Sequence, residues 1–531
     1  MPNNTNGELF TPHTVRLVEG ETVLPRRLDC PWWEHVSRSY AFLILSLFPL
    51  IIGPDTYLNI TGTKFYSFVV LTCIYLAACL VVGILFPPGV PRFLYLRSRS
   101  VQRPTLPQLL LLVYMLWAIV CTIASPYEGL WLGQNRYEGL CSILLYGAVF
   151  LLLSFWGEYT NRYIYALAFM GGVLGLLALP QTFGSTFLYP EGFTYWNSEF
   201  LTTIGHQDCV AGIICILLPA LLCAFVILGD AWRYLCLPAL FLLPYPAVFT
   251  DVDTAKMGFL VIAALLPFLF QSRKRLCRLL LGLSPMLLGM ALGMAFAGRN
   301  AERHFAPGAK ALVLTLAAAA LCALSWWLSH SEQNWSLSPT AVRRAGYGVM
   351  AALGLAGLVF LFTYGGDNRL LREASELLHG NLTDEAGTFR GYIWKGALAL
   401  IAEKPLLGGG PGCFVTRFVP FNEGYQAVTG ADVIVDFAHN DFLNIGVCTG
   451  LVGLGLYVAF LTALCVRTLR AVERCPVLLI FLAGMLGYLV YSFFVFSIAI
   501  VSPLFWVMAG LADKCVRQVN TDLQGEDGED S

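Results

Sequence analysis

Charged residues are scarce in this chain. Lysine and arginine together number 33 and aspartate and glutamate 34, so only 13% of the 531 residues are charged, while 57% are hydrophobic. A soluble domain usually carries about 25% charged residues, so this composition excludes an ordinary soluble protein and favours one surrounded by lipid. The formal net charge of −1 also leaves no basic excess of the kind that binds nucleic acid.

The cysteine spacings that metal sites and small disulfide-bonded domains need are also missing. The chain has 16 cysteines but no CxxC pair, and most of them lie within apolar runs, where they are expected to pack as small buried side chains. Neither a zinc site nor a disulfide framework is therefore expected. Residues 1–38 lack an apolar h-region, so no cleavable signal peptide is predicted, and the first apolar run is expected to act as the targeting segment.

Long apolar runs, by contrast, are plentiful. Roughly 17–25 apolar residues suffice to cross a bilayer as a helix. Fourteen runs approach this length, near 39–53, 65–86, 107–124, 139–156, 161–180, 207–228, 232–250, 255–270, 278–297, 311–328, 345–364, 441–466, 476–496 and 500–513. Because the first, eighth and last are short, twelve is the alternative count. The predicted fold is an all-α polytopic membrane protein of about 12–14 transmembrane helices.

The runs divide the chain into five parts. These are an N-terminal segment 1–38, a first transmembrane bundle 39–364, a long loop 365–440, C-terminal transmembrane helices 441–513 and an acidic, disordered tail 514–531. With fourteen spans, the arginine-rich loops after the second, eighth, tenth and twelfth spans share one side with the N-terminus, and positive charge marks the cytoplasmic side. Only the loop 298–310 departs from this rule. Both termini are then cytoplasmic and the long loop is extracytoplasmic.

The long loop is predicted to contain a helix from about Arg390 to Ala402, with Thr388 as N-cap and Lys404-Pro405 as the stop. Its apolar side chains share one face, so the helix is expected to lie along the membrane surface. A glycine-rich turn, Gly408–Gly412, follows.

Two residue groups in this region suit chemistry on a phosphorylated sugar. Arg390 offers a planar fork for phosphate oxygens, and glycines let a backbone approach a phosphate closely. The simpler alternative is that Arg390 reaches lipid head groups and the glycines only turn the chain. His439, beside Asn440 and Asp441, can accept a proton from a hydroxyl near neutral pH. The alternative for His439 is a histidine that only caps a helix.

Further charged residues lie near the same ends of other spans. Arg136, His206 and Lys256 are each expected at the extracytoplasmic end of a helix, and several cations on one side suggest an anionic ligand. Each taken alone is equally typical of a solvated loop charge. Asp251 and Asp253 form the D-x-D pattern that many metal-dependent glycosyltransferases use, but the pattern is common by chance, and no metal ion is predicted.

Three strings together resemble the O-antigen ligase/polymerase superfamily. They are RGYIW from Arg390, PLLGGGPGCF from Pro405, and HND from His439, with Gly450 beyond. The segment GHQD from Gly205 is similar to a Gly-Asn-Pro-Asn-type segment of the family. The resemblance covers roughly residues 40–513, and its specific part is 388–457.

The resemblance implies transfer of a glycan from an undecaprenyl-pyrophosphate-linked donor to a hydroxyl acceptor, at the outer face of the bacterial cytoplasmic membrane and without a metal ion or cofactor. It implies that Arg390 holds the leaving pyrophosphate and that His439 is the base. The other residues expected to bind substrate are Arg136, His206, Lys256, Trp394, Gly410, Asn440 and Asp441. Lys256 stands where the family commonly has arginine, and lysine lacks the bidentate fork of the guanidinium. Trp394 stands where the ligases have leucine.

The alternative reading is a transporter, such as a flippase for lipid-linked glycans. No internal repeat is evident, and the polar residues cluster outside the spans rather than within them, which argues against an ion-coupled transporter. Whether a family member of this kind is a ligase or a polymerase is left open, because both would use the same site.

Overall fold

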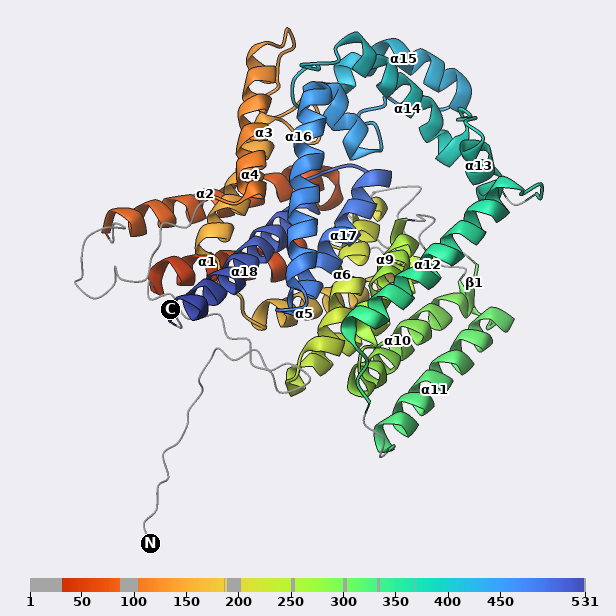
Figure 1. The fold of residues 1–531 in the computed structure, drawn as a ribbon. Helices are drawn as coiled ribbons and strands as arrows, with labels where there is room; N and C mark the ends of the chain where they lie inside the picture. The colour runs from red at the N-terminus through yellow and green to blue at the C-terminus, as the bar shows by residue number, and fades with distance from the viewer. Residues whose placement is uncertain are drawn as a thin grey trace.

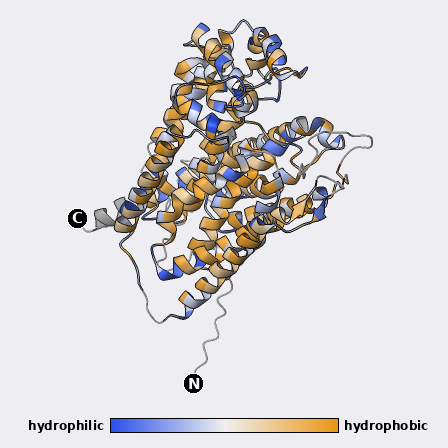
Figure 2. Cartoon of the chain, turned by 90° about the vertical axis from the view of Figure 1, so that its right-hand side faces the viewer, coloured by the Kyte–Doolittle hydropathy of each residue, from blue (hydrophilic) through white to orange (hydrophobic). Residues whose placement is uncertain are grey.

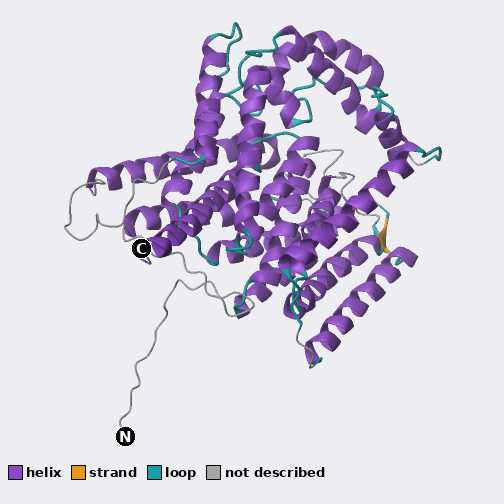
Figure 3. Cartoon of the chain, viewed as in Figure 1, coloured by secondary structure: helices purple, strands orange, loops and turns teal. Residues whose placement is uncertain are grey.

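The computed structural model describes residues 31–85, 104–185, 187–188, 202–249, 254–298, 303–331, 335–367 and 369–529. Helices make up most of these ranges (Figure 3), and the only strands in them are a short antiparallel pair, β1 (Phe296–Ala297) and β2 (His304–Phe305). Asp251, Asp253 and the four arginines of the loop after the second span lie outside the described residues.

The helices follow the apolar runs of the sequence. In the first part of the chain they are α1 (Pro31–Ser46), α2 (Ile60–Leu85), α3 (Leu106–Ile123), α4 (Leu140–Trp156), α5 (Arg162–Thr182), α6 (Gln207–Ile227), α7 (Cys236–Leu242), α8 (Pro244–Phe249), α9 (Thr254–Leu269), α10 (Arg273–Met294), α11 (Ala309–His330) and α12 (Pro339–Phe362). The later ones are α13 (Arg369–Leu378), α14 (Ala386–Glu403), α15 (Phe414–Thr429), α16 (Asp441–Ala471), α17 (Leu478–Phe494) and α18 (Ser502–Glu529). Short 3-10 turns, Phe48–Leu50, Thr56–Asn59 and Ala231–Leu235, join some of them.

Every predicted apolar run overlaps a helix, and the seventh is divided into α7 and α8. Within the described ranges, eight helices are long and apolar enough to cross a membrane by length and composition, and α4, α9 and α17 are shorter apolar helices. Figure 2 shows hydrophobic residues along most of the helices and hydrophilic ones gathered towards the ends of the molecule. An all-α polytopic membrane protein is thus confirmed, while the count of twelve to fourteen spans stays a prediction.

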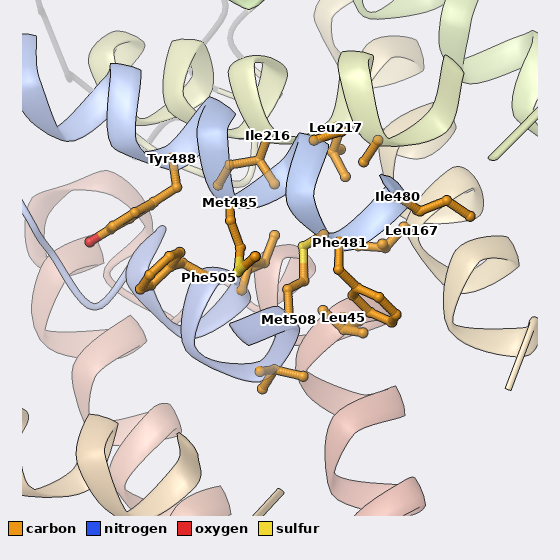
Figure 4. Close-up of a cluster of buried hydrophobic side chains, with 14 of the residues drawn as sticks. Leu45, Leu167, Ile216, Leu217, Ile480, Phe481, Met485, Tyr488, Phe505 and Met508 are labelled. Carbon is orange, nitrogen blue, oxygen red and sulfur yellow. The ribbon is translucent and has the colours of Figure 1, made fainter. Parts of the chain in front are cut away.

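The core is centred on α6 and α17. From Cys209 to Ile227 every residue of α6 is buried, and Figure 4 shows Ile216 of α6 beside Met485 of α17 and Met508 of α18. A Cβ on Gly487 of α17 would lie 2.0 Å from the carbonyl oxygen of Cys215. The absence of a side chain at Gly487 therefore lets the two helices approach closely, as small residues do in membrane bundles.

Two expectations about charge and order are wrong. The predicted disordered tail 514–531 begins too early: α18 continues past Asp513, because Val516 is buried and the guanidinium of Arg517 donates to the carbonyl of Ser154 at 3.3 Å. Polar residues were expected to cluster outside the spans, but Lys64, one residue before the predicted run 65–86, lies within the candidate span Thr56–Leu85 and is fully buried. Its ammonium donates to the carbonyl oxygen of Pro49 at 2.8 Å, where α1 has given way to a 3-10 turn that leaves carbonyls without helical partners.

The long loop forms a helical cap of α13, α14 and α15 at one end of the bundle (top of Figure 1). The predicted helix is present, because α14 has a break at Gly387–Phe389 and regular helix from Arg390 to Glu403. Thr388 is not its N-cap: its hydroxyl donates to the carbonyl of Gly387 instead of accepting from a helical N–H. Neither α13 nor α15 was predicted.

Gly450 breaks α16 near its start. Its backbone angles are φ 70° and ψ −178°, a region that only glycine occupies readily. The N–H of Leu451 consequently donates to the carbonyl of Pro405, at 2.7 Å, instead of to its own helix. A Cβ on Gly450 would lie 2.0 Å from the carbonyl oxygen of Leu406.

Gly450→Ala is therefore expected to destabilise the protein by about 2–6 kcal/mol, through backbone strain and overpacking together. The measurement is the melting temperature of the detergent-purified protein. Gly455→Ala is the matched control, since Gly455 lies in the same helix with ordinary φ and nothing within 4 Å of its position for a Cβ. Equal melting temperatures for the two variants would contradict this account of the break.

Candidate functional site

Three segments far apart in the sequence meet below the cap. They are the turn between α3 and α4, the Gly408–Gly412 turn and the segment that leads into α16. The N–H of Gln134 donates to the carbonyl of Gly412 at 3.2 Å, and the N–H of Gly410 donates to the carbonyl of Cys448 at 2.7 Å. These main-chain bonds hold the predicted site residues of each segment near one another.

Arg136 is positioned by an unusual backbone and an ion pair. Its φ is +52°, a value that non-glycine residues seldom adopt and that tight turns impose. The Nε atom donates to the carboxylate of Asp436 at 2.6 Å, and the guanidinium carbon lies 4.5 Å from the ring centroid of Phe496. Arg136 is thus held from both sides, by charge and by an aromatic face.

Phe496 lies in the segment between α17 and α18 and contacts Arg136, His439 and His206. These four residues are called the cluster below. The ring of Phe496 is fully buried, and its centroid lies 5.5 Å from that of His439 and 6.2 Å from that of His206, both edge to face. With Arg136, these residues come from four separate parts of the chain. The structure therefore brings together three residues that the sequence singled out separately.

His439 has the properties of a neutral base. Burial, followed by the positive charge of Arg390, lowers its pKa to about 4, so the imidazole is uncharged at neutral pH. Its Nδ1 atom is buried and has no hydrogen-bond partner among the described residues. A buried ring nitrogen of this kind is available to a ligand. The backbone φ of His439 is +47°, a strained value of the kind that clusters at functional sites.

His206 differs from His439 in its hydrogen bonding. It is the N-cap of α6, and its Nδ1 atom accepts from the N–H of Asp208 at 3.2 Å. Burial, and to a lesser degree the charge of Arg136, lowers its pKa, although Asp208 opposes the shift. A neutral ring that accepts at Nδ1 carries its proton on Nε2, so His206 can offer a donor where His439 can offer an acceptor.

Arg390 is the unpaired cation of the site. It opens the regular part of α14, is half-buried, and has no ion-pair partner within the described ranges. One turn later, the indole Nε1 of Trp394 is buried without a hydrogen-bond partner in the described part of the chain, and its ring meets that of Phe493 edge to face at 6.2 Å. A free guanidinium and a free N–H donor on one helix face suit an anionic, oxygen-rich ligand.

The other residues predicted to bind substrate do not present free polar groups to the cluster in the same way. Gly410, with φ +96°, donates its N–H within the protein, as do Gly408 and Gly409, so these amides are not directed at a ligand. Asn440 is buried and caps α16 by accepting from the N–H of Leu443 at 3.0 Å. Lys256 is exposed in the first turn of α9.

A small cavity of about 60 Å³ lies beside the cluster, bounded by Phe437 and Gly412 on one side. Glu138 and Asp441 both line it, and both approach Ser497: the hydroxyl of Ser497 lies 3.5 Å from a Glu138 oxygen, and its N–H lies 3.4 Å from an Asp441 oxygen. Tyr146 donates to the other Glu138 oxygen at 2.8 Å. Burial raises the pKa of Glu138 to about 8.

Sequence reasoning missed Asp436, Phe496 and Glu138. Glu138 lies two residues after Arg136 and Asp436 three residues before His439, so an acidic residue close to each predicted site residue was a usable signal. Phe496 is one aromatic among many in an apolar run, and nothing in its local pattern sets it apart. Among the described residues, no group of three or more His, Cys, Asp or Glu side chains is arranged to share a metal ion.

Comparison with known proteins supports the sequence resemblance. Residues 304–458 match a family model described as O-antigen ligase, a range that includes Arg390, Trp394 and His439 but not Arg136 or His206. The match confirms the predicted likeness to the O-antigen ligase superfamily. No match to the chain was found among curated proteins.

Proposed function

We propose that this protein transfers or polymerises glycan from an undecaprenyl-pyrophosphate-linked donor to a hydroxyl acceptor, in the synthesis of cell-surface polysaccharide. The observation that supports this best is that Arg390, a guanidinium without an ion-pair partner in the described ranges, lies near the neutral imidazole of His439. Arg390 lies close enough to His439 for its charge to lower the pKa of that ring, and His439 Nδ1 has no partner in the described part of the protein.

The two residues have complementary roles in this reaction. The acceptor oxygen attacks the anomeric carbon, the new glycosidic bond forms, and the bond from that carbon to the pyrophosphate oxygen breaks with its electron pair leaving on the phosphate. Negative charge grows on the leaving group, and Arg390 stabilises it. His439 takes the proton of the attacking hydroxyl and later releases it.

The neighbouring residues complete the donor site in this proposal. The indole N–H of Trp394 and the Nε2–H of His206 donate to substrate oxygens, while Arg136 contributes charge after exchanging Asp436 for phosphate. Asn440 and the turn at Gly410 fix the segment that carries His439. Asp441 is assigned to the acceptor side and Lys256 to the outer donor phosphate.

The proposed location is the outer face of the bacterial cytoplasmic membrane, with both termini cytoplasmic. The arginine-rich loops that share one side in the fourteen-span arrangement support it. Single cysteines placed at exposed residues of the cap, such as Glu385, test it by labelling of intact cells with a membrane-impermeant maleimide. Labelling only after lysis would place the cap, and the proposed site with it, on the wrong side.

The deciding experiment uses purified protein in detergent micelles with a synthetic undecaprenyl-pyrophosphate oligosaccharide. We expect longer glycans to form and undecaprenyl pyrophosphate to be released, because a micelle has no second compartment and transport would yield no product. A ladder of repeats would indicate a polymerase, and a single addition to a different acceptor a ligase. Unchanged donor, together with donor movement across the bilayer of proteoliposomes, would favour a flippase instead.

A further inference from the structure

Two cysteine thiols meet beneath the cap. Cys413 directly follows the Gly408–Gly412 turn and precedes α15, while Cys448 lies in the first turns of α16, before its break. Their Sγ atoms are 4.0 Å apart, and both side chains are buried within one hydrophobic cluster. An S–H group is a weak donor and a sulfur a weak acceptor, so this contact alone contributes little to holding the two segments together.

The main chain already holds the two cysteines close to each other. The N–H of Gly410 donates to the carbonyl of Cys448 at 2.7 Å, and the N–H of Cys413 donates to the carbonyl of Gly410 at 3.3 Å. A Cβ on Gly409 would lie 2.6 Å from the sulfur of Cys413, so the missing side chain leaves room for that thiol. The sulfurs of a disulfide are about 2.05 Å apart, and rotation about the χ1 bonds of the two cysteines can close the remaining distance with these main-chain hydrogen bonds kept.

A disulfide also needs an oxidising compartment, and the proposed function supplies one. In that proposal the cap and the start of α16 lie at the outer face of the bacterial cytoplasmic membrane, where disulfides form and persist. A disulfide here rests on this proposed location and not on the identity of the donor or the acceptor.

We propose that Cys413 and Cys448 form a disulfide bond in the protein that has reached the membrane. As the S–S bond forms, the two thiols lose two protons and two electrons, which pass to the disulfide of an extracytoplasmic thiol oxidoreductase and reduce it to a dithiol. Because both thiols are buried in the folded protein, this exchange takes place before the cap packs onto α16.

The bond would close a loop that carries part of the candidate site. The segment between Cys413 and Cys448 contains α15, Asp436 and His439. A disulfide joins the two ends of this segment and restricts the unfolded chain, which is the main way in which such bonds stabilise proteins. It therefore stabilises the segment that carries His439 and takes no part in the glycan transfer itself.

The test is differential thiol labelling of the full-length protein from bacterial membranes, with N-ethylmaleimide present from lysis onwards. The protein is denatured in the same reagent, then reduced and labelled again with deuterated N-ethylmaleimide, and its peptides are identified by mass spectrometry. We expect Cys413 and Cys448 to carry only the second label, and their peptides to be joined before reduction. Cys322, which is exposed on α11, is the internal control and should carry only the first label.

Cys413→Ala provides a matched variant. Cys448 should then carry the first label, because it has lost its partner. A reductant should lower the melting temperature of the wild-type protein and of Cys322→Ala, but not that of Cys413→Ala.

The first label on both Cys413 and Cys448 of the wild-type protein would overturn the proposal, and so would a peptide that joins either of them to a different cysteine. The labelling of cap cysteines in intact cells separates this result from that of the proposed function. If the impermeant maleimide reaches the cap, only the disulfide is wrong, and if it does not, the proposed location is wrong as well.

Discussion

Replacing His439 with alanine is expected to lower kcat for glycan transfer by about 10²–10⁴-fold, the usual contribution of a general base. The imidazole has no protein partner at Nδ1 in the described part of the chain, so its removal deletes a proton acceptor without unpairing another group. The initial rate with the undecaprenyl-pyrophosphate donor measures the effect. His330→Ala is the matched control, because His330 is exposed at the end of α11, and it should keep the wild-type rate.

The same role makes a prediction about pH. With a pKa of about 4, His439 is protonated and inactive as a base below this value and neutral above it, so the wild-type rate should rise with pH through about 4 and then level off. Arg390 lowers this pKa, and removing its positive charge makes protonation easier. Arg390→Gln should therefore move the acid limb to higher pH. Full activity in His439→Ala, or an unmoved limb in Arg390→Gln, would remove the base assignment.

Replacing Arg390 with alanine should lower kcat by about 10²–10³-fold, which is typical of losing one group that stabilises developing charge on a leaving oxygen. The fall should appear mainly in kcat and less in KM, because the charge on the bridging oxygen is greatest in the transition state. Arg390→Lys should recover part of the loss, since lysine keeps the charge but not the fork.

The control for this prediction lies in the same cap. Arg372 is exposed, with 58% of its side chain accessible, and its carboxylate neighbour Glu376 is 4.0 Å away. Arg372→Ala should leave kcat and KM unchanged, because an exposed pair of this kind contributes little. A loss in Arg372→Ala equal to that in Arg390→Ala would mean that any cation in the cap is enough, and the specific role of Arg390 would fail.

The sequence predicted the bundle well because each span must hide its backbone from lipid and therefore needs a long apolar run. Lys64 escaped this argument because it lies one residue before the predicted run 65–86, while the helix of the structure begins at Ile60 and buries it. Its partners, the carbonyls at the broken end of α1, are supplied only by the fold. The helices α13 and α15 were missed because the polar cap follows no such rule.

The candidate site was predictable in part and for a specific reason. Arg136, His206 and His439 were each noted as polar residues at the ends of apolar runs, and helix ends on one side of a bundle meet. Their common contact, Phe496, could not be predicted, because its role comes from the path of the chain between α17 and α18. The ion pair of Arg136 with Asp436 likewise depends on where the long loop returns.

The break in α16 and the Gly408–Gly412 turn are held together by main-chain hydrogen bonds. The break leaves the carbonyls of Val447 and Cys448 without helical donors, and the N–H groups of Gly409 and Gly410 supply them. A residue inserted into or deleted from either segment would shift this register, and main-chain N–H and carbonyl groups in both segments would then lose their hydrogen-bond partners. An insertion near Pro411 would therefore displace the start of α16, which follows His439. Engineered changes of length belong in the exposed part of the cap instead.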